Sequence, residues 1–394
     1  MNTYLEQYPY TKIIFGSGKR GEIGKICKDL GRVCLLVTSQ GFAKRYGYLD
    51  GLIAILEKDE TRVEIFSGIE PEPSDNTVIK LFEKIKKTAP DFLIALGGGS
   101  VIDATKCADA LATLGGNLND LYGTDRVSQA LRQADERLKP IIALPSTSGS
   151  GSEVTKYAVI YDETEQMKVL VADLAICPKI AVVDPEIIIS APLNLTIATG
   201  LDAFSHLIES YLNQKPAPNW VSEMTEKGIS LILENLPRVK ENLSDISARE
   251  KLSLASTYGG IAITFKGTGL PHGFSYSFKD ILLHGSAVAL TLLPSWRYYL
   301  PAVEEATRRL APVFGIDPSL ELNRVAEGIF SCIKKFFRSL GHPASLKEVK
   351  QVNEEVLQKA VMAVMKNPSK LENAPRPVPI GKAEEILKNI LVSD

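Results

Sequence analysis

The feature that most constrains the fold is a change of periodicity near the middle of this 394-residue chain. In the first half, short runs rich in Val, Ile and Leu alternate with amphipathic stretches of helical period. The runs predict strands at 33–38, 62–66, 91–96, 140–144 and 180–183. Two of the stretches between them, 75–88 and 101–114, predict helices. Strand, helix and strand at this spacing are typical of a parallel sheet with helices on both faces.

The second half, from Thr196 onward, shows helical periodicity almost exclusively. The clearest helices are predicted at 198–212, 223–234, 248–265, 320–340 and 354–365. The chain exceeds the roughly 250–300 residues at which a single core stops growing, so two domains are the default. We therefore predict a Rossmann-like α/β domain at 1–190, followed by an all-helical domain at 191–394.

Charge and cysteine content exclude several classes of function. The net charge of −2, from 45 basic and 47 acidic side chains, provides neither a nucleic-acid footprint nor a basic membrane patch. The five cysteines form no CxxC pair, and no apolar run is long enough to span a membrane. The first residues also lack the pattern of a signal peptide. We predict a cytoplasmic protein with reduced cysteines that binds neither nucleic acid nor membrane and acts on small molecules.

Histidine is scarce and clustered in this chain, which points to a metal site. Asp202 and His206 are four residues apart in a predicted helix, so both side chains project from one face. His272 and His284 are each followed by glycine, which suits two ligands presented from either side of a loop. A carboxylate with three imidazoles suits Fe(II), Zn(II) or Mn(II) better than Mg(II) or Ca(II).

Two polar loops that follow predicted strands are candidates for binding a dinucleotide. The segment GGGS at 97–100 lies between a strand and a helix, where glycines let a phosphate approach the N–H groups of the helix start. The segment PSTSGSGSEVT at 145–155 also follows a strand and is rich in hydroxyls. Both lie at carboxyl ends of parallel strands, where open sheets bind ligands. With a metal site facing this crevice, we expect hydride transfer to or from a nicotinamide while the metal polarises an oxygen.

Taken together, these motifs resemble the iron-containing (group III) alcohol dehydrogenase family nearly from end to end. The collinear motifs are YPYTKIIFGSG at 8–18, IEPEPSDNTV at 69–78, GGGSVIDATK at 97–106, PSTSGSGSEVT at 145–155, DPE at 184–186, TGLDAFSHLIESY at 199–211, LPHG at 270–273, LLHG at 282–285, GHPASL at 341–346 and NAPRPV at 373–378.

The resemblance implies a fold, shared with dehydroquinate synthase, in which a helical metal-binding domain follows the dinucleotide-binding domain. It implies metal ligation by Asp202, His206, His272 and His284. It implies dinucleotide binding by Ser39, Gly97, Gly98, Gly99, Ser100, Asp103, Ser146, Thr147, Ser150 and Lys168. The implied enzyme is a homodimer that uses Fe(II) or Zn(II) and NAD(P) to oxidise a small alcohol or reduce an aldehyde or ketone.

The coenzyme prediction depends on Ser39, which ends the second predicted strand. Family members that prefer NAD usually carry Asp there, where it bonds the adenosine ribose. Without that carboxylate a 2′-phosphate is not repelled, and Lys44 and Arg45 follow closely, which favours NADP(H). The alternative is that Ser39 is a turn residue without influence on the coenzyme. Lys168, on sequence alone, would be a solvated charge of a helix or loop.

The substrate side departs from the family at Tyr276, where most members carry another His. We take Tyr276 and His272 as the candidate catalytic residues, although Tyr276 is also compatible with a core aromatic. A phenol has a reference pKa of about 10, so it passes protons less readily than imidazole at neutral pH. The stretch from Tyr276 to His284 is also shorter than usual in the family. The family resemblance therefore leaves the substrate open.

Three other functions stay open on the sequence. A glycerol-type polyol dehydrogenase would share the fold and lack one histidine ligand. A metal- and NAD-dependent cyclase or lyase resembling dehydroquinate synthase would need a strongly basic pocket, and the predicted helices carry no Lys and Arg cluster near the ligands. A non-catalytic nucleotide-binding descendant would have no need for the intact ligand set.

Overall fold

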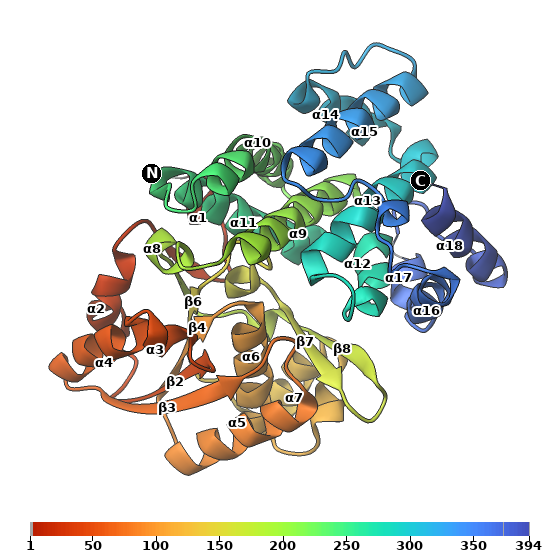
Figure 1. Cartoon of the computed structure of the whole chain (residues 1–394). Helices are drawn as coiled ribbons and strands as arrows, with labels where there is room; N and C mark the ends of the chain where they lie inside the picture. The colour runs from red at the N-terminus through yellow and green to blue at the C-terminus, as the bar shows by residue number, and fades with distance from the viewer. Residues whose placement is uncertain (1–2, 373, 394) are drawn as a thin grey trace. The chain divides into compact units, whose positions relative to one another are not determined.

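A computed structural model describes residues 3–372 and 374–393, so Asn373 of the NAPRPV motif lies outside the described residues. The chain divides into two compact units, Met1–Ala191 and Pro192–Asp394. Every strand of the described residues lies in the first unit, and the second unit is helical (Figure 1). This arrangement confirms the predicted fold class, a parallel α/β sheet followed by a helical region.

A parallel sheet forms the centre of the first unit, in the order β1-β9-β6-β4-β2-β3 over the described residues. Its strands are β1 (Lys12–Phe15), β2 (Val33–Ser39), β3 (Arg62–Ile69), β4 (Phe92–Gly97), β6 (Ile141–Pro145) and β9 (Ile180–Val183). Each predicted strand lies within one of them or differs from it by a residue at an end. Strand β1 was not predicted, because its apolar run of three residues, Ile13 to Phe15, is short and only partly buried.

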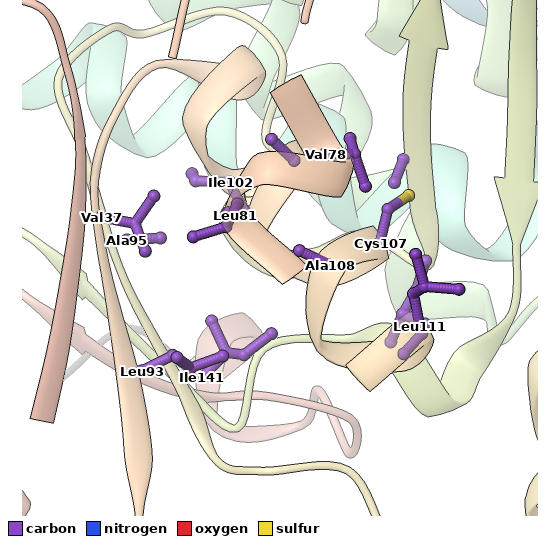
Figure 2. Packing of buried hydrophobic residues seen from close by; sticks show 14 of the residues in the cluster. Val37, Val78, Leu81, Leu93, Ala95, Ile102, Cys107, Ala108, Leu111 and Ile141 are labelled. Atoms are coloured by element: carbon purple, nitrogen blue, oxygen red, sulfur yellow. The ribbon is translucent and has the colours of Figure 1, made fainter. Parts of the chain in front are cut away.

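Side chains of the central strands alternate between two hydrophobic clusters, one on each face of the sheet. Leu35, Val37 and Leu93 pack with helices α5 (Asp75–Thr88) and α6 (Gly99–Leu114), as Figure 2 shows for Val37 and Leu93. Their neighbours in the chain face the opposite way and pack with α2 (Ile23–Cys27) and α4 (Tyr48–Lys58). Burial on both faces explains why these strands are continuous hydrophobic runs.

The first unit also contains a smaller sheet that the sequence analysis did not predict. Strands β7 (Tyr157–Asp162) and β8 (Met167–Ala172) form an antiparallel hairpin, and β5 (Gly123–Thr124) pairs with β8. The remaining helices of this unit are α1 (Thr3–Glu6), α3 (Phe42–Arg45), α7 (Arg126–Ala134) and α8 (Pro185–Ile188). Lys168 is therefore a strand residue, and the expectation of a solvated helix or loop charge was wrong.

The second unit is built around α9 (Leu193–Leu212), which packs against α10 (Asn219–Glu241), α11 (Ile246–Lys266) and α13 (His284–Tyr299) (Figure 1). Its other helices are α12 (Leu270–Ser275), α14 (Glu304–Leu310), α15 (Leu322–Ser339), α16 (Glu354–Met365), α17 (Pro368–Glu372) and α18 (Ala383–Val392). Each helix predicted for this half is present. None of the helices in the described part of the chain has the length and apolarity needed to cross a bilayer.

Candidate functional site

Three helices of the second unit bring the four predicted metal ligands together. Helix α9 carries Asp202 and His206 one turn apart, α12 carries His272, and His284 is the first residue of α13. Gly285 allows α13 to approach α9 closely. A Cβ atom at Gly285 would lie 2.0 Å from a backbone oxygen of α9 and 2.6 Å from the Cβ of Asp202. The absence of a side chain at this position therefore sets how near His284 comes to Asp202.

One carboxylate oxygen lies at the centre of this cluster. Asp202 Oδ1 is 3.9 Å from His206 Nε2, 3.6 Å from His272 Nε2 and 3.7 Å from His284 Nε2. The Nε2 atoms of His206 and His272 are 2.8 Å apart. Asp202, His206 and His272 are buried and offer ligand atoms within 4.8 Å of one another. His284 completes the set from the exposed side, with 34% of its side chain accessible.

The surroundings of Asp202 fit a divalent cation. Asp202 Oδ1 is buried and has no hydrogen-bond partner among the described residues. A buried acceptor left unsatisfied costs about 1–3 kcal/mol, and more when it is charged. The atoms facing it are imidazole nitrogens, which together with a carboxylate oxygen are ligands of Fe(II) and Zn(II). An ion among these four atoms would satisfy Oδ1 and separate the Nε2 atoms of His206 and His272.

The cluster is electrostatically coupled. Burial opposes the charge of Asp202, but His206, His284 and His272 outweigh it and hold the pKa of this carboxyl well below its usual range. Burial also disfavours the charged form of His272, but Glu209 and Asp202 outweigh burial and raise the pKa of His272 to about 9. A metal ion that bound to His272 would therefore have to displace a proton.

Glu209 belongs to this cluster, and the sequence analysis missed it. It lies on α9, one turn beyond His206, and is buried. Its Oε1 is 2.5 Å from His272 Nδ1, and its Oε2 accepts a hydrogen bond of 2.6 Å from the Gly269 N–H. Burial raises the pKa of Glu209, but His272 and the Gly269 N–H outweigh burial, so the pKa lies below its usual value. The available signal was the i, i+4, i+7 spacing of Asp202, His206 and Glu209 on a helix that carries no other charged side chain.

Tyr276 lies directly after α12, at the start of a 3₁₀ turn, Tyr276–Phe278. Its ring stacks on His284 with 6.2 Å between centroids. Ser275, the residue before it, donates a hydrogen bond of 2.8 Å to the carbonyl oxygen of His272, and its Oγ lies 3.3 Å from His284 Nδ1. The two candidate catalytic residues, His272 and Tyr276, are thus both placed at the ligand cluster.

In the first unit, the two predicted nucleotide loops contact each other where β4 and β6 end. The Ser146 N–H donates a hydrogen bond of 2.9 Å to the Gly97 carbonyl oxygen. A Cβ atom at Gly99, the first residue of α6, would lie 2.7 Å from Ser150 Oγ. One at Gly98 would lie 3.4 Å from an oxygen of the second loop, that of Thr147. Glycine is therefore required at 99 for the second loop to pack on the helix start.

Two charged side chains of α6, the buried Lys106 and the partly buried Asp103, hold the second loop in place. Lys106 donates hydrogen bonds to the carbonyl oxygens of Ser152 and Thr155 at 2.8 and 2.9 Å. Asp103 accepts a hydrogen bond of 3.0 Å from the Val159 N–H and a second one from the Ser152 hydroxyl. Asp103, predicted to bind the cofactor, thus has both carboxylate oxygens bonded to protein groups. Lys106 was not predicted, although both residues lie in the GGGSVIDATK motif.

Lys168 and Ser100 are linked through Glu72. The Lys168 ammonium lies 2.6 Å from Glu72 Oε1, and only 9% of its side chain is exposed. The Glu72 N–H donates a hydrogen bond of 3.1 Å to Ser100 Oγ. Glu72 has a φ of 56°, a backbone conformation uncommon for residues other than glycine. This strained residue connects the small sheet to the first glycine-rich loop.

Ser39 is the last residue of β2, and the pairing of β2 with β3 shifts register between Thr38 and Ser39. Lys44 and Arg45 are exposed on the short helix α3 that follows. The predicted coenzyme-selecting residues therefore lie on one strand end and the next helix, in the same unit as the glycine-rich loops.

Comparison with known proteins covers nearly the whole chain. Residues 10–185 match the family profile "Iron-containing alcohol dehydrogenase", and 196–391 match "Fe-containing alcohol dehydrogenase family, C-terminal". The NAD-dependent methanol dehydrogenase of Bacillus methanolicus is 30% identical over 383 residues, which are 96% of this chain and 97% of that protein. The NADPH-dependent butanol dehydrogenase of Clostridium saccharobutylicum is 28% identical over 331 residues, 84% of this chain and 83% of that protein.

A solved structure agrees with these matches. The iron-containing alcohol dehydrogenase of Thermotoga maritima is 29% identical, with a TM-score of 0.80 and 98% of each chain covered. Family profiles, a full-length relative and the fold all indicate the same assignment. The chain belongs to the iron-containing alcohol dehydrogenase family and is an oxidoreductase that transfers hydride between a small alcohol or carbonyl compound and a nicotinamide coenzyme.

Proposed function

We propose that this alcohol dehydrogenase binds one divalent ion, Fe(II) or Zn(II), through Asp202, His206, His272 and His284. The observation that carries this proposal is the approach of three Nε2 atoms to Asp202 Oδ1, an oxygen that is buried and lacks a partner among the described residues. The polyol dehydrogenase alternative, with one imidazole fewer, is not favoured, because all three imidazoles lie at this oxygen.

The residues around the ion have separable tasks in this proposal. When bound, the ion supplies Lewis acidity at an alcohol or carbonyl oxygen, and the nicotinamide supplies hydride exchange. Asp202 contributes the one negative charge of the ligand set, so three neutral imidazoles leave the site with a net positive charge. Tyr276, stacked on the partly exposed His284, is our candidate for exchanging the proton of the substrate hydroxyl.

For the coenzyme, we propose that NADP(H) is preferred over NAD(H). Relatives named as NAD-dependent and as NADPH-dependent both occur, so family membership does not decide this point. The support is local: Ser39 places a hydroxyl rather than a carboxylate at the end of β2, and two exposed cations, Lys44 and Arg45, follow on α3. The start of α6 and the loops packed against it would receive the pyrophosphate.

The coenzyme proposal is tested by Ser39→Asp. A carboxylate at this position repels a 2′-phosphate and can bond a ribose hydroxyl. We expect the ratio of kcat/KM for NADPH to that for NADH to fall by about tenfold or more, the equivalent of about 1.4 kcal/mol. Ser17→Asp, at another position of the first unit, serves as the control. An unchanged ratio in Ser39→Asp would show that residue 39 does not select the coenzyme.

The substrate class, assembly and location complete the proposal. Relatives carry the names of methanol, butanol and 1,3-propanediol dehydrogenases, so we propose a short primary alcohol or the matching aldehyde. A homodimer and a cytoplasmic location, with Cys27, Cys34 and Cys107 buried as free thiols, stay predictions from the sequence. Gel filtration with light scattering measures the first of these directly.

The metal proposal is tested with NADPH oxidation against a panel of short aldehydes. We expect activity to be lost on EDTA treatment, restored by Fe(II) or Zn(II), and abolished by His272→Ala. His342→Ala is the matched control, because His342 lies outside the cluster and bonds the Pro343 carbonyl oxygen through Nδ1. Activity that survives both chelation and His272→Ala would refute the metal-dependent mechanism.

A further inference from the structure

We infer that Glu209 and Ser275 are positioning residues that select one tautomer on His272 and His284, so that both rings turn an Nε2 lone pair toward the ion. Both side chains bond Nδ1, which lies on the side of each ring away from the ion site. They therefore act through the histidines and not on the substrate. The inference rests on the proposed metal site and specifies which side chains orient its imidazole rings.

Glu209 determines the tautomer of His272. A carboxylate only accepts hydrogen bonds, so the 2.5 Å contact with Glu209 Oε1 requires a proton on His272 Nδ1. A neutral imidazole with its proton on Nδ1 has its lone pair on Nε2. That Nε2 is the atom 3.6 Å from Asp202 Oδ1. Glu209 thus makes the ring a ligand in the direction of the cluster.

The same carboxylate also fixes the segment that presents His272. Its second oxygen accepts the N–H of Gly269, the residue directly before α12. The next N–H, that of Leu270, is bonded by the hydroxyl of Tyr299 at 3.0 Å. A Cβ atom at Gly269 would lie 3.0 Å from that hydroxyl, so the segment is held closely on both sides. Ring orientation and helix start are therefore set by one side chain of α9.

Ser275 determines the tautomer of His284 in a similar way, but more weakly. A serine hydroxyl has one proton, and Ser275 donates it to the His272 carbonyl oxygen at 2.8 Å. Toward His284 Nδ1, at 3.3 Å, the hydroxyl can then only accept. This again places the ring proton on Nδ1 and the lone pair on Nε2. Since His284 is partly exposed, water can replace the hydroxyl, and the effect of Ser275 is expected to be smaller than that of Glu209.

Glu209→Gln is the sharpest variant, because it keeps the shape of the side chain and removes one acceptor. Both partners of Glu209, the His272 Nδ1–H and the Gly269 N–H, are donors. A glutamine offers one oxygen and one NH₂ group, so one partner must lose its bond. If the NH₂ group faces His272, the ring must carry its proton on Nε2, where it cannot bind a metal. Loss of such an outer partner typically weakens metal binding 10–100-fold.

The first experiment measures Zn(II) affinity of the metal-stripped, full-length protein in competition with a chromophoric chelator. We expect Glu209→Gln to bind Zn(II) about 10–100-fold more weakly than wild type, and Ser275→Ala less than tenfold more weakly. Asp173→Asn is the matched control for the first change. Asp173 is also a buried carboxylate with two backbone partners, the N–H groups of Ser128 and Ala175, but it lies in the first unit. Its affinity should equal that of wild type.

Ser295→Ala is the matched control for Ser275→Ala. The Ser295 hydroxyl is buried on α13 and has no hydrogen-bond partner among the described residues, so its removal should leave Zn(II) affinity unchanged. Circular dichroism of each metal-free variant confirms that the helices are intact before affinities are compared.

The second experiment reads the tautomers directly in the wild-type protein. Because the chain contains four histidines, ¹⁵N-histidine labelling gives a spectrum simple enough to assign by single substitutions. In the Zn(II)-loaded wild type we expect protons on Nδ1 of His272 and His284, with His342, bonded to Pro343, as the internal reference. A proton on Nε2 of His272 would overturn the inference. So would a folded Glu209→Gln that binds Zn(II) as tightly as wild type.

These outcomes are separate from failure of the proposed function. If wild type binds no Zn(II), or if His272→Ala binds it as tightly as wild type, the metal site itself is wrong. If wild type needs the ion for activity but Glu209→Gln retains both affinity and tautomers, the metal site stands and only the positioning role of Glu209 falls.

Discussion

Each unit buries a carboxylate oxygen that has no hydrogen-bond partner among the described residues. The pKa values of these two carboxyl groups shift in opposite directions. Asp202 of the helical unit is surrounded by imidazoles, which hold its pKa well below the usual range despite burial. Asp109 of the α/β unit lies on α6, and its other oxygen accepts a hydrogen bond from the Lys139 N–H. Burial raises the pKa of Asp109 to about 7, and Lys139 offsets only part of that rise.

The difference shows what distinguishes a ligand site from an ordinary buried acid. A buried oxygen without a hydrogen-bond partner indicates only that a further partner is needed. At Asp109, protonation of the carboxyl group is enough. At Asp202 the charge persists, and the neighbouring atoms are nitrogens that can share a cation. The α/β unit neutralises or pairs such charges within the protein, as the buried Lys106 and the partly buried Asp103 show. In the site we propose, the charge of the helical unit is left for an ion to neutralise.

Asp202→Asn should have the largest effect, because it removes the charge while keeping the shape of the side chain. The amide binds a divalent ion poorly, and loss of the Lewis acid removes several kcal/mol of transition-state stabilisation. We expect kcat/KM to fall at least a hundredfold and bound metal, measured by elemental analysis, to fall with it. The melting temperature of the metal-free protein should fall, because the imidazoles that lower the pKa of Asp202 stabilise the fold through its charged form.

Asp109→Asn is the control for that change, because it alters the other unpartnered carboxylate. Its metal content and kcat/KM should match wild type. If Asp202→Asn kept its metal, or if Asp109→Asn lost it, the proposed difference between the two carboxylates would be wrong.

Lys106→Met should have the next largest effect, on stability rather than on metal binding. The ammonium is buried and donates to the Ser152 and Thr155 carbonyl oxygens, so its loss leaves these acceptors unpaired and Asp103 without its cation. Removing one partner of a buried charged network destabilises by about 3–5 kcal/mol. Chemical unfolding should show this loss.

Lys80→Met, at an exposed position of α5, is the control and should change stability by less than about 0.5 kcal/mol. Lys106→Met should also weaken coenzyme binding, because the loop at 145–155 loses its anchor, while the metal content of the folded fraction stays at the wild-type level. A wild-type unfolding curve for Lys106→Met would show that the α/β unit does not depend on pairing its buried charges.

Most of the fold could be predicted from the sequence because periodicity reports burial. Strands β2 and β4 contain continuous apolar runs, at 33–37 and 92–96, since both faces of the sheet are covered, and the helical half repeats its apolar residues at helical spacing. The hairpin β7–β8 was missed for a physical reason. Only every second residue of Tyr157–Asp162 is buried, and its turn places Gln166 at a φ of 52° without a glycine to mark it.

The clustering of Asp202 with three histidines could be predicted because histidine is rare in this chain, so its position in the sequence carries information. Glu209 could not, because glutamate is common on helices and is usually solvated. Its role becomes visible only when folding brings Gly269 and His272, which are distant in sequence, to its two oxygens. The same holds for Lys106, whose acceptors are backbone carbonyls that no sequence motif marks.

Asp109→Asn should change the free energy of unfolding by less than Lys106→Met does, and the size of the change depends on pH. The unfolded carboxyl ionises near pH 4, whereas the folded one keeps its proton to about pH 7. Between these values the unfolded state binds fewer protons, so the wild type loses stability as pH rises through this window and then levels off. Asparagine, which mimics the neutral carboxyl, removes that loss.

We therefore expect Asp109→Asn to exceed wild type in stability by about 1–3 kcal/mol at pH 8, with the difference shrinking as pH falls to 5. Urea unfolding at several pH values measures it. Asp245→Asn should behave in the opposite sense, because the Ala248 N–H and Arg238 lower the pKa of Asp245 and its charged form stabilises the fold above pH 4. If Asp109→Asn gave the same pH dependence as wild type, the proton would not be what satisfies Asp109, and the contrast with Asp202 would lose its basis.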